Sequence, residues 1–305
     1  MRSELRKDYL LNKYVIITPS RTQRPRDISE QTVLHRDKKC VFCAHNKEPK
    51  KILDVIKKNS HNQVLSIQNK YPALTLNNTK AYGTQEVIIE TPKHGTEFSE
   101  LPVKDIELIL KMYQMRTKAL SKIKKLDYIL IFKNNGSKAG ASIMHAHSQI
   151  FATDIIPPDV QEEISAVKNY YTHKKTNVYE DIIQKERKGK RLIYDDNLMV
   201  AFCPYASQYH YEAWIFPKRF VDNITDLNTK EISALASVLK NILQKLNSLN
   251  IAYNFFMHQI ISNPHQYFCI KIQPRDSIWA GVELGAGIVI NSMPPEDAAK
   301  FYRKK

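Results

Sequence analysis

The sequence lacks a long uninterrupted apolar run, although 43% of its 305 residues are hydrophobic. A helix that spans a bilayer needs about 20 consecutive apolar residues, so we expect no membrane-spanning segment. The apolar core of a signal peptide is also missing behind the first residues, Met1 to Asp8, which favours a cytoplasmic protein.

Cysteine is scarce, and the four cysteines lie at positions 40, 43, 203 and 269. So small a number does not indicate a secreted fold held together by disulfides. In a reducing compartment, a close pair such as Cys40 and Cys43 is more typical of a metal site.

The chain also lacks an arginine-rich arm or a dense basic helix, despite a formal net charge of +15 and a pI near 9.5. Its lysines are spread over the whole length, which indicates a general compositional bias. We therefore expect neither nucleic acid nor a membrane as a partner, while the positive charge favours small phosphorylated metabolites.

An internal repeat organises the rest of the sequence. The runs Glu86–His94 and Glu212–Phe220 are both apolar and strand-like, and each contains a Pro-Lys pair near its end. Apolar residues then recur with helical spacing over 103–125 and 229–246. Each predicted helix is followed by two strand-like segments, which are 128–132 and 145–151 in the first copy and 253–257 and 269–274 in the second.

Two copies of a strand–helix–strand–strand unit predict an α+β fold, with a mainly antiparallel sheet and helices packed on it. We place the first unit at residues 1–165 and the second at residues 166–305. A charged connector covers 157–191, and its charge run at 185–191 is typical of a solvated helix and turn. The pairing order of the strands does not follow from the sequence.

Cys40 and Cys43 form a Cys-x-x-Cys pair, whose thiolates can bind one tetrahedral metal ion from a tight turn, most commonly zinc. The pair supplies half of a site, and two buried cysteines or a redox pair are the alternatives. His94 and His145 are candidate partners, because two cysteines and two histidines make a normal closed zinc site.

The segment His145-Ala146-His147-Ser148-Gln149 carries the strongest signal for chemistry. On a strand, residues two apart face the same side, so His145, His147 and Gln149 share one face. A neutral imidazole held at one nitrogen is a good nucleophile at the other and can attack an α-phosphorus. We expect one of the two histidines to attack and the other to bind metal, with Gln149 donating to a non-bridging oxygen. The alternative is that both histidines bind metal.

Three further segments are candidates for contact with phosphates or a nucleoside. The small-residue loop from Asn134 to Gly140 has backbone amides that suit phosphate oxygens. Arg21 and Arg24 are close enough in the sequence to bind one diphosphate together, although a basic surface turn is the simpler interpretation. Asn69 lies in a predicted turn, where an asparagine can also read a base or a ribose.

Taken in their order along the chain, these segments resemble those of the galactose-1-phosphate uridylyltransferase family of the histidine-triad superfamily. The likeness runs from Leu5-Arg6-Lys7-Asp8 to the C-terminal segments 283–291 and 294–299, and so covers nearly the whole chain. It is especially similar to a compact branch that includes ADP-glucose phosphorylase-like proteins. The resemblance implies two tandem histidine-triad-like units, the second degenerate, in a homodimer.

The resemblance also assigns the site residues. It implies a structural zinc on Cys40, Cys43, His94 and His145. His147 would be the nucleophile that becomes nucleotidylated, with Gln149 beside the α-phosphate. The implied substrate residues are Arg21 and Arg24 at the phosphates, Asn69 at the nucleoside, Asn134, Gly140 and Ser142 in a phosphate cradle, and Glu283 near the sugar.

The second half departs from longer relatives of the family. Cys269 and Lys271 stand where those relatives have a metal-binding histidine pair, although His258 remains. One catalytic histidine pair per chain is therefore expected. The stretch 277–282 does not reproduce the hexose-binding residues of the well-known uridylyltransferases.

Three functions follow from these features. The first is a ping-pong hexose-1-phosphate uridylyltransferase, which passes UMP from UDP-glucose to a sugar 1-phosphate through a covalent His147–NMP intermediate. The second is an NDP-sugar phosphorylase, such as one for ADP-glucose, with the same intermediate and inorganic phosphate as the acceptor. The third is a non-catalytic, zinc-stabilised nucleotide-binding protein, which the intact set of His145, His147 and Gln149 argues against.

Overall fold

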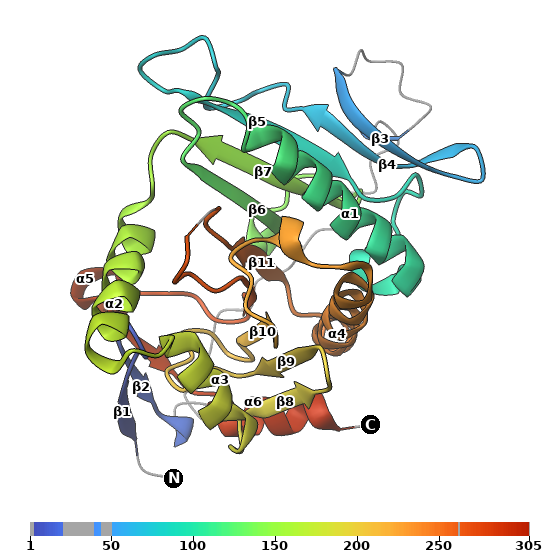
Figure 1. Ribbon diagram of the computed structural model, residues 1–305. Helices are drawn as coiled ribbons and strands as arrows, with labels where there is room; N and C mark the ends of the chain where they lie inside the picture. The colour runs from blue at the N-terminus through green and yellow to red at the C-terminus, as the bar shows by residue number, and fades with distance from the viewer. Residues whose placement is uncertain (1–2, 21–39, 44–50, 262, 305) are drawn as a thin grey trace.

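The computed structural model describes residues 3–20, 40–43, 51–261 and 263–304. Ten strands form one sheet in the order β3-β4-β5-β7-β6-β11-β12-β10-β9-β8, with helices packed on it (Figure 1). Every strand pair in this sheet is antiparallel. The expected α+β class, with a mainly antiparallel sheet, is confirmed.

The first half contains the predicted repeat unit. Its elements are β5 (Gly83–Ile89), 3-10 helix η2 (Phe98–Glu100), α1 (Val103–Leu120), β6 (Tyr128–Asn135), 3-10 helix η3 (Ser137–Ala139) and β7 (His147–Thr153). The hairpin of β3 (Ile52–Lys58) and β4 (His61–Gln68) extends the sheet at this end. Because β7 pairs with both β5 and β6, the strand that carries His147 lies inside the sheet.

The second half repeats this arrangement. Its elements are β10 (Ala213–Pro217), 3-10 helix η4 (Ile224–Asp226), α4 (Thr229–Ser248), β11 (Tyr253–His258) and β12 (Cys269–Pro274). β12 lies between β11 and β10, as β7 lies between β6 and β5. The short strands β8 (Leu192–Asp195) and β9 (Met199–Phe202) form the other end of the sheet.

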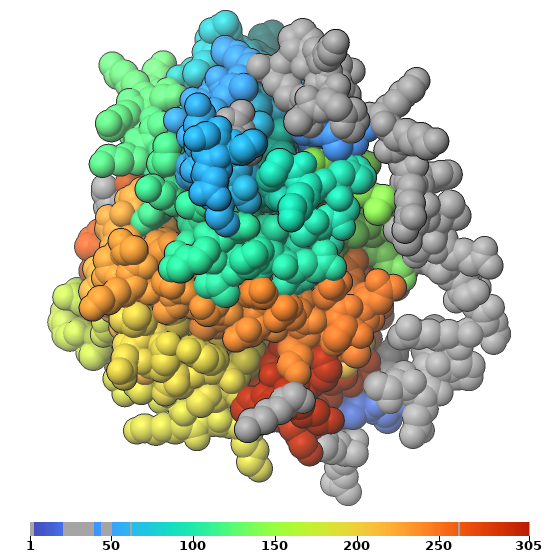
Figure 2. Space-filling model, turned by 90° about the vertical axis from the view of Figure 1, so that its right-hand side faces the viewer, coloured from blue at the N-terminus to red at the C-terminus, as the bar shows by residue number. Residues whose placement is uncertain are grey.

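The two halves join edge to edge through β6 and β11. In this antiparallel pair Phe132 is opposite Phe256, and Asn134 is opposite Asn254. Helices α1 and α4 also contact each other, and Figure 2 shows first-half residues (blue to teal) meeting second-half residues (orange) across one face. Gln114 on α1 strengthens this seam, since its side-chain amide donates to the carbonyls of Ile224 and Leu227, both at 2.9 Å.

Helices α1 and α4 cover one face of the sheet. Ile109 and Tyr113 on α1 and Leu239 on α4 are fully buried there. A capping box begins α4: Asn228 accepts from two backbone amides of the first turn, and Glu231 accepts from the amide of Asn228.

Within the described ranges, no helix combines the length and apolar character needed to cross a bilayer.

The connector between the halves folds into α2 (Pro158–Lys174) and α3 (Val178–Arg187), which pack on the opposite face of the second half. The expected unit boundary at residues 165 and 166 falls inside α2, and the division of the chain stays a prediction. The charge run at 185–191 is solvated only in part, because Glu186 is fully buried and its carboxylate pairs with Arg191 at 2.8 Å.

A separate three-stranded sheet holds β1 (Glu4–Lys7), β2 (Tyr14–Ile17) and β13 (Ile288–Asn291). β2 pairs antiparallel with β1 and parallel with β13, so the two ends of the chain meet in this sheet. The short helices α5 (Gly281–Ala286) and α6 (Pro295–Arg303) flank β13 in sequence. In Figure 1, α5 lies at the left, separate from β7 in the upper part of the molecule.

The continuous sheet predicts that the two halves unfold together. Both tryptophans, Trp214 and Trp279, lie in the second half, so tryptophan fluorescence reports on that half. Ile109→Ala removes a fully buried side chain of the first half, which should cost about 2–5 kcal/mol of unfolding free energy. We expect the urea midpoint followed by tryptophan fluorescence to fall together with that followed by circular dichroism. A tryptophan transition that stays at the wild-type midpoint would show that the halves are independent.

Candidate active site

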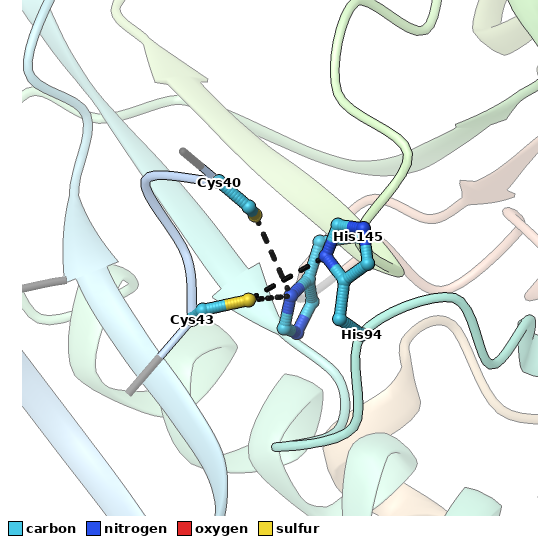
Figure 3. Close-up of side chains that lie close together, drawn as sticks. All are labelled: Cys40, Cys43, His94 and His145. Atoms are coloured by element: carbon cyan, nitrogen blue, oxygen red, sulfur yellow. Dashed lines mark hydrogen bonds between the residues drawn. The ribbon is translucent and has the colours of Figure 1, made fainter. Parts of the chain in front are cut away.

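The side chains of Cys40, Cys43, His94 and His145 point toward one another, as Figure 3 shows. Their four ligand atoms lie within 4.8 Å of one another. The Sγ–Nδ1 distances are 3.7 Å from Cys40 to His145, 3.6 Å from Cys43 to His145 and 3.5 Å from Cys43 to His94. A tetrahedral zinc ion would separate sulfur and nitrogen ligands by about 3.6 Å, so this donor set fits such an ion.

The surrounding chain fixes His145 for this role. The carbonyl of Thr91, just beyond β5, accepts a hydrogen bond from His145 Nε2 at 2.7 Å. The Nδ1 lone pair is therefore directed at the two sulfur atoms, which is the usual arrangement for a metal-binding histidine. Burial lowers the pKa of His145 below its ordinary value, which favours the neutral form that a metal requires.

The face of β7 that carries His147 is opposite the one covered by α1. Ser148 points toward α1, where its hydroxyl oxygen accepts from Tyr113 at 2.7 Å. Its neighbours His147 and Gln149 therefore point to the other face. The ring of His147 packs there against Phe42, with 5.1 Å between the ring centroids, so the turn of the two cysteines also covers the histidine.

One ring nitrogen of His147 is held by its own strand. His147 Nδ1 lies 2.9 Å from the carbonyl oxygen of His145, which can only accept, so Nδ1 carries the proton. The lone pair is thereby on Nε2. Burial lowers the pKa of His147 below its ordinary value, which favours the neutral form of the ring. A neutral, oriented imidazole with a free Nε2 lone pair is the form a nucleophilic histidine needs.

The loop after β6 differs in detail from the expected phosphate cradle. The amides of Ala139 and Ala141 donate to the carbonyl of Gly136, and the amide of Gly140 donates to Ser137. These three donors are therefore used inside the 3-10 turn and do not point to a ligand. Gly136 and Gly140 both have positive φ values, +83° and +84°, which explains why glycine occupies them.

The second half supports this loop through residues that the sequence did not single out. The side-chain amide of Asn254 donates to Asn134 Oδ1 and to the Ala139 carbonyl, both at 2.8 Å. Arg275 donates in turn to Asn254 Oδ1 at 2.6 Å. Asn134 lines one end of a cavity of about 620 Å³, which continues across β11 and β12 to Arg275 and Trp279. No sequence signal pointed to Asn254, because its contact with Asn134 depends on the pairing of β6 with β11.

The remaining predicted substrate residues lie on separate segments of the chain. Asn69 follows β4, where its side chain accepts from the amide of Tyr71 at 2.9 Å, as a turn asparagine does. Ser142 is exposed in the segment between η3 and β7. Glu283 lies on α5 beside the small sheet and accepts from the amides of Ala280 and Ile290. The arginines expected at the phosphates, positions 21 and 24, fall outside the described residues.

Lys271 and His258 of the second half both lie beside the carboxylate of Glu163. Lys271 Nζ lies 3.5 Å from Glu163 Oε1, and His258 Nε2 lies 3.2 Å from the same oxygen. Burial alone would raise the pKa of Glu163, but His258 and Lys271 hold that pKa well below its ordinary value. Among the residues with defined positions, Cys40, Cys43, His94 and His145 are the one cluster that meets the criteria for a metal site.

Comparisons with known proteins agree with this fold. The family model described as galactose-1-phosphate uridyl transferase, N-terminal domain, matches residues 1–157. A second model, described as a domain of unknown function, matches residues 104–301. ADP-glucose phosphorylase of Arabidopsis thaliana is 30% identical, with 99% of this chain and 92% of that protein covered. Galactose-1-phosphate uridylyltransferase of Thermotoga maritima is 27% identical, with 99% and 98% covered.

Solved structures give the same result. The crystal structure of the Arabidopsis thaliana ADP-glucose phosphorylase with bound ADP-glucose superposes with a TM-score of 0.89 and 30% identity, covering 100% of this chain and 99% of that one. A uridylyltransferase structure has a TM-score of 0.79 and 26% identity, with 99% and 97% covered. Fold and sequence thus define a nucleotidyltransferase. The chain belongs to the galactose-1-phosphate uridylyltransferase family, including its ADP-glucose phosphorylase-like branch.

The ligand geometry predicts one tightly bound metal ion per chain. Cys40→Ser/Cys43→Ser removes both sulfur ligands, so the metal content of the purified protein should fall from about one equivalent to nearly none. Elemental analysis measures this directly. Cys203→Ala is the matched control, because this buried thiol lies in the second half and should leave the metal in place. Full metal occupancy in the double cysteine variant would contradict the assigned ligands.

Proposed function

We propose that the chain transfers a nucleoside monophosphate from a nucleotide sugar to a second phosphate through a covalent intermediate on His147. The observation that carries this proposal is the hydrogen bond from His147 Nδ1 to the His145 carbonyl, 2.9 Å long. It selects the tautomer in which Nε2 attacks, and it can strengthen as the ring gains positive charge.

The reaction would proceed in two displacements at one phosphorus atom. In the first, His147 Nε2 forms a bond to the α-phosphorus while the bond to the leaving sugar 1-phosphate breaks. In the second, an oxygen of the acceptor phosphate attacks the same phosphorus, the P–N bond breaks, and the neutral histidine returns. Gln149 lies on the same face and would donate its amide to a non-bridging oxygen as negative charge builds there.

Zinc is the metal that the two-cysteine, two-histidine set favours. A zinc ion bound by Cys40, Cys43, His94 and His145 would supply structural cross-links between three chain segments. His145 would then fix the start of β7 two residues before the nucleophile. Among the described residues the cysteines form no disulfide, and Cys40 and Cys43 lie beside histidines instead, which suits a reducing compartment such as the cytoplasm.

Two donor–acceptor pairs share this intermediate. A hexose-1-phosphate uridylyltransferase would use UDP-glucose and a sugar 1-phosphate, as expected first from the sequence. An NDP-sugar phosphorylase would use ADP-glucose and inorganic phosphate. The higher identity and TM-score of the Arabidopsis thaliana ADP-glucose phosphorylase, compared with those of the uridylyltransferases cited above, favour the second pair. A non-catalytic role is not supported, because the chain keeps its nucleophile and its metal ligands together.

The substrate contacts inferred from the family complete the proposal. Asn134, Gly140 and Ser142 would lie near the phosphates, Asn69 near the nucleoside, Glu283 near the sugar, and Arg21 and Arg24 at the phosphates. Glu283 lies on α5, separate from β7 in Figure 1. It would therefore reach a nucleotide sugar bound at His147 from a second copy of the chain, which supports a homodimer as the working unit.

Intact mass after incubation with UDP-glucose, ADP-glucose or a GDP-sugar tests the covalent step. We expect an added NMP with one donor, lost in His147→Ala and retained in His173→Ala, a histidine exposed on α2. Release of the adduct by inorganic phosphate would indicate a phosphorylase, and release by a sugar 1-phosphate would indicate a uridylyltransferase-type reaction. If no donor gives an adduct in the wild type, the covalent mechanism is wrong.

A further inference from the structure

A fully buried ion pair lies on the face of β7 opposite the His147 ring. Lys133 on β6 and Glu90 just beyond β5 bring Nζ and Oε2 to 2.7 Å, and their side chains are 1% and 0% exposed. Because β7 lies between β5 and β6, the pair reaches across the strand of the nucleophile. Lys133 Nζ also donates to the main-chain carbonyl of His147, at 3.1 Å.

This hydrogen bond gives the His147 carbonyl a donor at the point where the hydrogen-bond ladder between β6 and β7 ends. The amide of Glu90 donates to the carbonyl of Ala146, so the main-chain groups of residue 146 face β5 and those of His147 face β6. The ladder between β6 and β7 ends at Phe132 and Gln149. The Lys133 ammonium therefore replaces a strand partner for His147, with a charged donor in a buried setting.

The same pair is linked to the next residue of β7. Tyr113 lies with its hydroxyl 3.4 Å from Glu90 Oε1 and donates to the Ser148 hydroxyl at 2.7 Å. Two consecutive residues of β7, His147 and Ser148, are thus held from the α1 side by one polar network. On the opposite face, the His147 ring is held by the His145 carbonyl, so backbone and ring are fixed independently.

The second repeat provides an internal comparison. On β6 the residues facing α1 and α4 are Ile129, Ile131 and Lys133, and on β11 they are Tyr253, Phe255 and Met257. The second repeat, which has no His-x-His segment, thus has aromatic and thioether side chains on the face where the first repeat has a buried ammonium. The sheet itself does not require the charge, because the same fold is built without it in the second half.

We propose that Lys133 and Glu90 are positioning residues for the nucleophile, a role that rests on the proposed function of His147. Lys133 holds the His147 carbonyl, and Glu90 holds Lys133, so the strand cannot shift when the imidazole attacks. Neither side chain touches the substrate, because both lie on the helix-covered face. A displacement of a reacting group by about 1 Å can lower a rate about 100-fold.

A single substitution in this pair would change both the position of the nucleophile and the stability of the fold, so a lower rate could not be assigned to either cause. Lys133→Met leaves a buried carboxylate without its partner, which is strongly destabilising, whereas removal of both charges restores stability. The informative variant is therefore Lys133→Met/Glu90→Gln. We expect it to regain most of the thermal midpoint that Lys133→Met loses. It should still form the His147 adduct about 100-fold more slowly in single-turnover mass measurements, with the Kd for the nucleoside monophosphate within twofold of wild type.

The buried pair of Arg191 and Glu186 supplies a matched control, since it lies in α3 and the turn that follows, away from β7. Arg191→Met/Glu186→Gln should form the adduct at the wild-type rate. A wild-type adduct rate in Lys133→Met/Glu90→Gln would overturn the proposal, and so would a loss explained entirely by weaker nucleotide binding.

A second readout separates this proposal from the proposed function. In wild-type protein labelled with nitrogen-15 histidine, the His147 Nδ1–H should give a protected resonance, because it donates to the His145 carbonyl. We expect this resonance to broaden or vanish in Lys133→Met/Glu90→Gln and to persist in Arg191→Met/Glu186→Gln. If no donor produces an adduct in the wild type, the proposed covalent mechanism is wrong. The resonance still tests whether Lys133 and Glu90 position His147. An unchanged resonance in the double variant would contradict it.

Discussion

The double pairing of β7, with β5 on one edge and β6 on the other, is the constraint on which the site depends. An inner strand cannot rotate or slip without breaking two ladders, so its alternation fixes which side chains face the helices. Ser148 is directed toward α1, and His147 and Gln149 are directed to the other face. The placement of these side chains therefore follows from the sheet.

Two further groups of residues hold the beginning of β7. The Cys40, Cys43, His94 and His145 cluster suits a metal that would cross-link the chain just before β7, and Thr91 orients the histidine. Thr91 follows Glu90, whose carboxylate pairs with Lys133 on the other face. One short segment beyond β5 thus supports both the candidate metal ligands and the backbone of the proposed nucleophile.

The sequence predicted the repeat, the α+β class and the Cys–His cluster, because apolar periodicity and the resemblance to a known family are visible without coordinates. It could not predict that β6 pairs with β11, since the order of strands in a sheet depends on which strand edges come together in the fold. Lys133 was missed because a lysine in an apolar strand gives no sign of burial before its partner Glu90 is placed. The amides of the loop at Gly140 were expected to bind phosphate, but the tight turn uses them internally.

The central claim is that His147 attacks through Nε2 because Nδ1 is held by the His145 carbonyl. Phosphorus NMR of the trapped intermediate, prepared with histidine labelled at each ring nitrogen in turn, tests this claim most directly. We predict a phosphoramidate whose phosphorus couples to Nε2 of His147 and shows no one-bond coupling to Nδ1. Attachment through Nδ1, or an adduct on any other residue, would contradict the account.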